Sequence, residues 1–211
     1  YVLPVKAEIP GIKISTLLLS ERLKYLPERL SDEYEAIFLI ALQKQFKYYS
    51  RAVTESPIPF LFVNETLEKV PDYKNLILPV DLRSETSDSA LWCSYFGRYN
   101  HSEIVAVAAN DRGRDEQKEV AKNVVLARKL FQKFNIQHKV YRGKGSSLRN
   151  SFDALELALI SNADLLILLG SSTITPLDIL VGLPERKIIR QAEKLNILLV
   201  NPRRDNYIMC D

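Results

Sequence analysis

The 211-residue chain is poor in the residues that build metal sites and disulfide frameworks. It has only two cysteines, Cys93 and Cys210, and two histidines, His101 and His138. No carboxylate or cysteine is spaced from either histidine as a co-ligand, so we expect no metal site. The two thiols lie too far apart in sequence to suggest a disulfide framework. Cys93 falls inside an expected helix, where a cysteine commonly serves as a small apolar filler.

The chain also lacks a long apolar run and a large excess of charge of either sign. No run reaches the ~18 apolar residues that would cross a bilayer, and no signal peptide is recognisable. With 29 basic and 26 acidic residues the net charge is +3, which argues against a nucleic-acid partner or a membrane surface. The 46% content of hydrophobic residues is typical of a globular core, and we expect a cytoplasmic protein.

From about residue 74, apolar runs alternate with amphipathic segments, as in a doubly wound α/β fold. Apolar runs without polar alternation, typical of buried parallel strands, fall at 75–81, 103–110, 137–142, 163–170 and 196–202. Helices are expected between them at 84–99, 115–134, 149–161 and 185–194. Residues 74–211 are therefore predicted to form a complete unit, a five-stranded parallel sheet with helices on both faces.

Residues 1–73 repeat the second half of that pattern. The segment "EAIFLIAL" (35–42) corresponds to "ADLLILLG" (163–170), which aligns Leu42 with Gly170. Likewise, "PFLFVNE" (59–65) corresponds to "NILLVNP" (196–202), and the first copy is shorter between its two strands. We therefore predict a partial second copy of the same unit.

This partial copy should contain helices near 14–31 and 45–55 and an earlier strand at 1–7. Pro27 is expected to break the first helix near its end. Half a sheet with an exposed apolar edge is not stable alone. Either further residues lie upstream, or the half unit packs on the complete one.

Two connections also receive structural predictions. The charged segment 110–119 is expected to be solvated. The glycine-rich segment "YRGKGSS" (141–147) lacks the spacing of a P-loop. A turn near a helix cap, involving Ser146 or Ser147, is the favoured interpretation there.

Three segments give the chain a resemblance to the universal stress protein family. They are "ILPVDLRSETSDSAL" (77–91), "NADLLILLGSS" (162–172) and "GLPERKIIRQAEKLNILLVNPR" (182–203). The resemblance implies that family's fold, an adenine nucleotide alpha hydrolase-like five-stranded parallel sheet, over roughly residues 74–204. Residues 30–66 resemble half of another unit.

The resemblance also implies a tandem pseudo-dimer whose fifth strands meet. Both candidate fifth strands, 60–63 and 197–200, are apolar without alternation, which suits edges that pair with one another. We expect them to pair within the chain. A homodimer and an unidentified protein partner are further expectations.

ATP-binding members of that family carry Gly-x2-Gly-x9-Gly-[Ser/Thr] after the fourth strand and an aspartate at the end of the first. By this resemblance Asp81 matches the aspartate, Gly170 the first glycine and, with the loop one residue short, Gly182 the third. Thr173 stands at the second glycine, and Leu183 replaces the hydroxyl residue. The nucleotide motif is therefore degenerate.

Two interpretations of this loop remain open. In the first, "TPLD" (175–178) starts a short apolar helix that seals the edge of the sheet, and Pro176 offers no N–H to a phosphate. In the second, Gly170 and the hydroxyls of Ser171, Ser172 and Thr173 still hold the phosphates of ATP with magnesium.

Three functions follow. The chain is a regulatory or interaction protein that binds no nucleotide or other cofactor, an ATP or AMP sensor that uses Asp81, residues 170–173 and Gly182, or an adenylating enzyme. The last is the weakest, because no histidine, cysteine or paired carboxylate falls at the strand ends. We favour the first, a protein that is not an enzyme and acts through its dimer-like surfaces.

Overall fold

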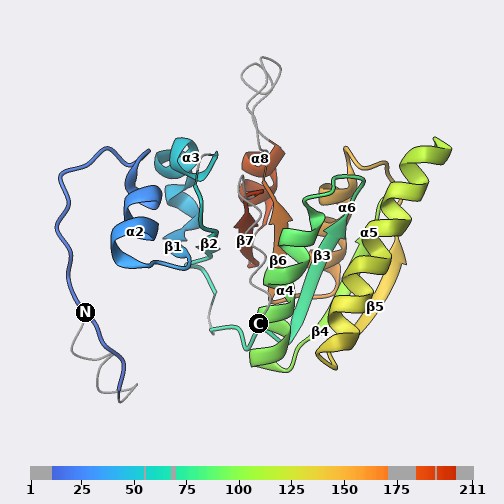
Figure 1. Ribbon diagram of the computed structural model, residues 1–211, viewed down its shortest axis with the longest axis horizontal. Helices are drawn as coiled ribbons and strands as arrows, with labels where there is room; N and C mark the ends of the chain where they lie inside the picture. The colour runs from blue at the N-terminus through green and yellow to red at the C-terminus, as the bar shows by residue number, and fades with distance from the viewer. Residues whose placement is uncertain (1–10, 55, 68–69, 171–183, 193, 203–211) are drawn as a thin grey trace.

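The computed structural model describes residues 11–54, 56–67, 70–170, 184–192 and 194–202 (Figure 1). Its strands form one sheet in the order β1-β2-β7-β6-β3-β4-β5. They are β1 (Leu39–Leu42), β2 (Phe60–Val63), β3 (Asn75–Val80), β4 (Glu103–Ala108), β5 (Gln137–Arg142), β6 (Leu165–Leu169) and β7 (Asn196–Val200). Neighbouring strands are parallel except β2 and β7, which are antiparallel.

Helices cover both faces of this sheet. They are α2 (Leu26–Tyr34), α3 (Phe46–Thr54), α4 (Thr86–Asn100), α5 (Arg114–Lys133), α6 (Asn150–Ile160) and α8 (Pro184–Gln191), and a short 3-10 turn, η1 (Gln43–Gln45), precedes α3. Helices α4 and α5 pack on one face, and α3, α6 and α8 pack on the other (Figure 1).

The central strands are buried on both faces, which explains their unbroken apolar runs. In β7, Ile197 and Leu199 belong to the core beneath α3, α6 and α8. Leu198 and Val200 belong to the core beneath α4 and α5. Because successive strand residues point to opposite faces, a strand covered on both sides has no polar position. The predicted α/β fold is confirmed, because strands β3 to β7 and helices α4, α5, α6 and α8 lie close to the expected bounds.

The first helix of the partial copy was predicted in the wrong place. Residues 12–20 form neither helix nor strand, and the helix is α2 instead. Pro27 lies in the first turn of α2, so it helps to start a helix rather than break one. A proline fits there because the first N–H groups of a helix have no intrahelical partner. The strand expected at 1–7 lies outside the described residues.

Strands β2 and β7 join the two parts of the chain. Phe60 lies opposite Leu199, Leu61 opposite Leu198 and Phe62 opposite Ile197. The pairing expected within the chain between residues 60–63 and 197–200 is therefore present, and association of two molecules stays a prediction. Among the described residues, none of the helices combines the length and apolar character that crossing a bilayer requires.

Candidate ligand site at the carboxyl edge of the sheet

Two of the predicted site residues meet where β3 and β6 end. Asp81 follows β3 directly and Gly170 follows β6, and these two strands are parallel neighbours. Arg83 bridges the two ends, because its Nη1 donates to the backbone oxygen of Gly170 at 3.4 Å. The other predicted site residues, Ser171, Ser172, Thr173 and Gly182, lie outside the described residues.

The carboxylate of Asp81 is buried and already has several donors. Arg83 donates two hydrogen bonds to Oδ2 of Asp81, from Nε at 3.0 Å and from Nη2 at 2.6 Å. The Arg83 backbone N–H, at 2.9 Å, and the Thr86 hydroxyl, at 3.3 Å, both donate to Oδ1. A carboxylate offers about four lone-pair positions. The oxygens of Asp81 are therefore almost fully used by the protein itself.

Two buried asparagines, which the sequence analysis missed, hold the strand ends. Asn123 of α5 donates from Nδ2 to the backbone oxygens of Asp81 and Arg83, both at 2.8 Å. Asn150, the first residue of α6, donates to the oxygens of Val80 and Val107 at 3.0 and 2.8 Å. The one available signal was a polar residue at a helix position that faces the sheet, as Asn123 does.

A third polar side chain, Asp111, connects the loop after β4 to the loop after β5. Asp111 is 9% exposed, and its carboxylate accepts from the Ser147 hydroxyl at 2.5 Å and from the Ser147 N–H. The Ser147 oxygen in turn accepts from the N–H of Leu82. The prediction that residues 110–119 are simply solvated is therefore wrong at Asp111, since this carboxylate satisfies donors of another loop. The turn expected around Ser146 is present, because its backbone oxygen accepts from the N–H of Arg149.

No protein-family model and no curated protein matches the sequence. Solved structures do resemble it. A universal stress protein from Archaeoglobus fulgidus DSM 4304 superposes with a TM-score of 0.67 over 97% of this chain and 76% of its own length, at 14% identity. The chain has the universal stress protein fold.

Two structures from Pseudomonas aeruginosa have a similar fold. One, from strain UCBPP-PA14 and assigned to the universal stress proteins, has a TM-score of 0.62 at 11% identity. The other, a protein of unknown function from strain PAO1, has a TM-score of 0.59 at 12% identity. Each match covers 95% of this chain and 76% of the other. At these identities the likeness is one of fold alone.

Within this universal stress fold, Gly170 has a packing role. An added Cβ at Gly170 would overlap the side-chain oxygen of Asn201. The Nδ2 of Asn201 donates to the backbone oxygens of Val53 and Ser56, which belong to the other part of the chain. Gly170 does not have a positive φ. The close approach of Asn201 thus disfavours a side chain at this position, a reason for the glycine that involves no ligand.

In the described part of this universal stress fold, the reactive side chains are not grouped. Cys93 is fully buried in α4, and burial raises the pKa of its thiol. His138 contacts the backbone oxygen of Ile136 through Nδ1 at 2.9 Å. Among the described residues, no group of histidine, cysteine and acidic side chains has the arrangement of a metal site.

Proposed function

We propose that this chain is a regulatory or interaction protein of the universal stress type that binds no ATP and acts through a pseudo-dimeric pairing of two units. The observation that carries the first part is the occupation of Asp81 by Arg83. The aspartate that the resemblance assigns to the nucleotide accepts instead from a neighbouring guanidinium.

A nucleotide would have to displace this pair. Hydrogen bonds to charged groups contribute about 1.5–3 kcal/mol each, and a two-pronged arginine–carboxylate contact is also fixed in geometry. The side chain of Arg83 is 37% exposed, so water screens part of the attraction. Even so, the described residues do not favour ATP with magnesium, because the carboxylate of Asp81 accepts from Arg83 and the N–H of Gly170 donates to the backbone oxygen of Val200 at 2.7 Å.

The strand register supports the pseudo-dimeric part. When "FLFVN" (60–64) is aligned with "ILLVN" (197–201), Leu61 becomes the equivalent of Leu198. These two residues lie opposite one another at the centre of the antiparallel pair. A register centred on equivalent residues is the mark of a two-fold, self-complementary interface.

The strands next to this pair extend the correspondence. Leu39 lies beside Phe60 in β1 and β2, and Leu166 lies beside Ile197 in β6 and β7. Gln43 is therefore the structural equivalent of Gly170. The expected match of Leu42 with Gly170 is displaced by one residue, because alignment by apolar residues does not fix the register of two leucine-rich strands.

Polar contacts across the β2–β7 pair follow the same two-fold relation. Asn64 and Asn201, equivalent in the alignment, each reach over to the end of the opposite helix. Asn64 donates to the oxygen of Ala192 after α8 at 3.3 Å, and Asn201 donates to the oxygen of Val53 in α3. These contacts support a division into a partial unit at 1–73 and a complete unit at 74–211.

An ATP or AMP sensor is the second candidate, and Arg83 is also the observation that favours it. Its partly exposed guanidinium lies beside Gly170, where the predicted phosphate loop begins. A guanidinium in that place is suited to a phosphate group. In this case Asp81 positions Arg83, and Ser171, Ser172, Thr173 and Gly182 complete the site.

Calorimetric titration with magnesium-ATP and with AMP separates the two functions. We expect no binding at submillimolar nucleotide by the natural protein or by Arg83→Ala. We also expect Arg83→Ala to lower the free energy of unfolding by ~1–3 kcal/mol, because the buried carboxylate of Asp81 loses its charged partner. The control Arg142→Ala removes an exposed hydrogen bond to Asn110 and should have a small effect on that free energy. A submillimolar dissociation constant that Arg83→Ala abolishes would establish the sensor.

A further inference from the structure

A cleft of about 530 Å³ lies between α3 and α8, away from the candidate ligand site. Its lining includes residues that directly follow β1 and β2, such as Gln43 and Asn64, and residues that precede β7, such as Lys194. Because β2 runs antiparallel to β7, this is the sheet edge opposite to the one where Asp81 lies. The volume is in the range of small-molecule sites, about 300–1,000 Å³. We call it the α3–α8 cleft.

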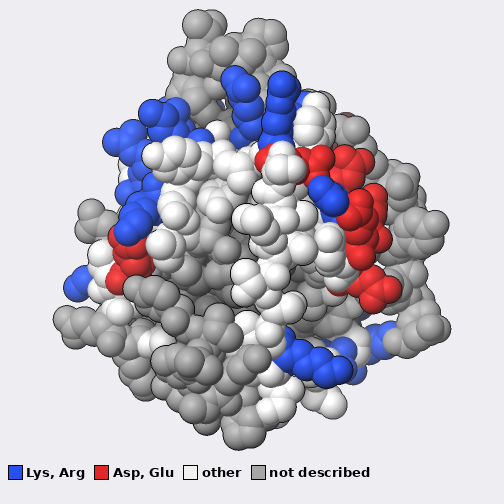
Figure 2. Space-filling model, turned by 90° about the vertical axis from the view of Figure 1, so that its left-hand side faces the viewer, with Lys and Arg blue, Asp and Glu red and all other residues white. Residues whose placement is uncertain are grey.

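Positive charge gathers around the α3–α8 cleft. Its lining contains the cations Lys44, Lys47, Arg186, Arg190 and Lys194. Lys44 is paired with Glu65 at 2.6 Å, whereas the other four make no ion pair with any residue that the structure describes. Figure 2 looks onto the side that carries α2 and α3, and Lys and Arg side chains gather along one flank of it.

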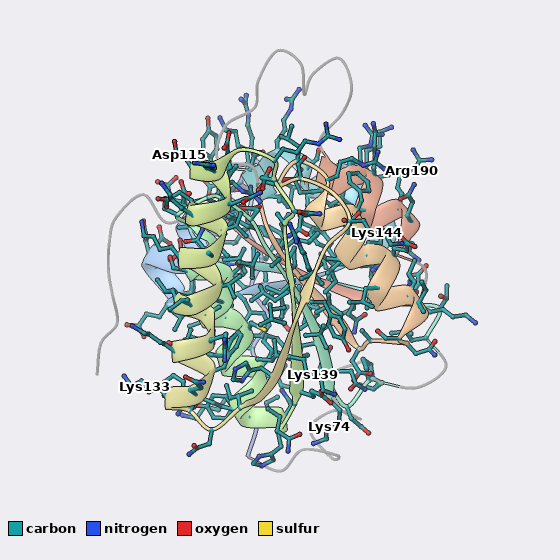
Figure 3. The ribbon with its side chains drawn as sticks, turned by 90° about the vertical axis from the view of Figure 1, so that its right-hand side faces the viewer. Lys74, Asp115, Lys133, Lys139, Lys144 and Arg190 are labelled. Carbon is teal, nitrogen blue, oxygen red and sulfur yellow. The ribbon has the colours of Figure 1, made fainter. Side chains whose placement is uncertain are left out.

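The cations come from both walls of the cleft. Lys47 lies in the first turn of α3, and Arg186 and Arg190 are one turn apart on α8. Residues four apart on a helix project from the same face, so these two guanidinium groups act together. Arg190 lies on the flank of the molecule away from α5 (Figure 3). An anion in the cleft would therefore meet charge from two sides.

The neutral polar groups of the cleft are already satisfied. Gln43 donates to the oxygen of Leu195 at 2.5 Å and accepts from Nδ2 of Asn64 at 2.9 Å. The oxygen of Asn64 accepts from the N–H of Thr66 at 2.8 Å. These bonds hold the floor of the cleft in place. The groups that remain available to bind a ligand are therefore the cations of the lining. The buried side chains of Phe46 and Ile189 add an apolar surface.

We propose that the α3–α8 cleft binds a small organic anion with two phosphate groups. Guanidinium groups match phosphate oxygens with two parallel hydrogen bonds, and the first turn of α3 adds the partial positive charge of a helix N-terminus. Cations on both walls suit a ligand charged at both ends. The apolar surface of Phe46 and Ile189 suits the carbon skeleton between them. The site is independent of the carboxyl-edge site and of the function proposed for it.

Titration calorimetry of the full chain with fructose 1,6-bisphosphate at physiological salt tests this. We expect a submillimolar dissociation constant, no binding of fructose and much weaker binding of inorganic phosphate. The double variant Arg186→Gln/Arg190→Gln should weaken the bisphosphate about tenfold or more, at least 1.4 kcal/mol. The matched control is Lys129→Gln/Lys133→Gln, which removes two exposed cations with the same spacing from α5 and should leave the affinity unchanged.

Absence of bisphosphate binding would overturn the proposal, as would an equal loss in the test and control variants, which would indicate charge attraction alone. Equal affinity for inorganic phosphate would overturn the assignment of two phosphate groups. Tighter binding of a hexaglutamate peptide would assign the cleft to an acidic protein segment instead. Circular dichroism checks the fold of each variant. Arg83→Ala should bind the bisphosphate as the natural protein does, because the α3–α8 cleft is separate from the site at Asp81. Failure of this proposal can therefore be distinguished from failure of the function proposed for the site at Asp81.

Discussion

At the scale of single residues, Gly170 and Asn201 show how a residue of a nucleotide motif can have another role. Gly170 follows β6 at the place of the first motif glycine, yet its missing side chain is explained by the amide of Asn201 lying against it. Asn201 is held there by its bonds to Val53 and Ser56. The glycine thus serves the contact between the two parts of the chain.

Gly170→Ala should therefore destabilise the protein through Asn201. Overpacking of a filled site costs about 1–3 kcal/mol, so we expect a loss of this size in the free energy of unfolding, measured by urea denaturation. In the background Asn201→Ala the same change should cost clearly less, because the overlapping atom is gone. Equal costs in both backgrounds, a coupling energy near zero, would show that Asn201 is not the reason for the glycine.

At the scale of elements, burial decided which predictions succeeded. Strands such as β6 and β7 were predictable, because cover on both faces leaves an apolar run that few other structures produce. Helix α5 was predictable from its apolar face, on which Val120, Ala127 and Phe131 are buried. The helix expected at 14–31 was wrong before residue 26, where α2 begins. The apolar run around Leu18 is not covered by other described residues, and Leu18 is 97% exposed.

The position of the candidate site was predictable, but the contacts that its residues make were not. The resemblance to the universal stress protein family assigned Asp81 and Gly170 to the ends of two strands, at the edge of the sheet where ligands of such folds bind. It did not reveal that Arg83 turns back onto the carboxylate, because that depends on a side-chain rotamer within one loop. Nor did it reveal the contact between Gly170 and Asn201, which requires the register of β6 on β7 and the position of α3.

Strand β2 supplies the next prediction. Phe62 is fully buried, and its ring lies 5.2 Å from that of Phe46 in α3 and 5.7 Å from that of Phe60. Phe62→Ala should lower the free energy of unfolding by about 3–5 kcal/mol, because it opens a cavity in the core shared with β7. The control Tyr48→Ala, on the exposed side of α3 with Tyr48 72% exposed, should have little effect.

Urea denaturation followed by far-ultraviolet circular dichroism measures both variants. We expect a single transition that moves to lower urea in Phe62→Ala. Two separate transitions, of which only the smaller one moves, would mean that β1, β2 and α3 unfold on their own and are not part of the common core.

At the scale of the whole molecule, the single sheet depends on one antiparallel junction. Each parallel pair of strands lies within one of the two parts of the chain, and among the described strands β2 and β7 form the pair that connects the parts. The junction covers β7, whose residues are all buried in the complete chain. Removing residues 1–73 would expose an apolar edge strand, and such edges pair with other strands.

The fragment 74–211 should therefore dimerise where the complete chain pairs β2 with β7. Leu198 would lie opposite Leu198 of a second fragment, in the register that Leu61 now occupies, because the present register is centred on equivalent residues. Sedimentation velocity over a range of concentrations measures this. The fragment with Leu198→Lys should stay monomeric, because a charge at the centre of the edge opposes pairing. A fragment that is folded by circular dichroism and yet monomeric at high concentration would contradict the two-fold relation between β2 and β7.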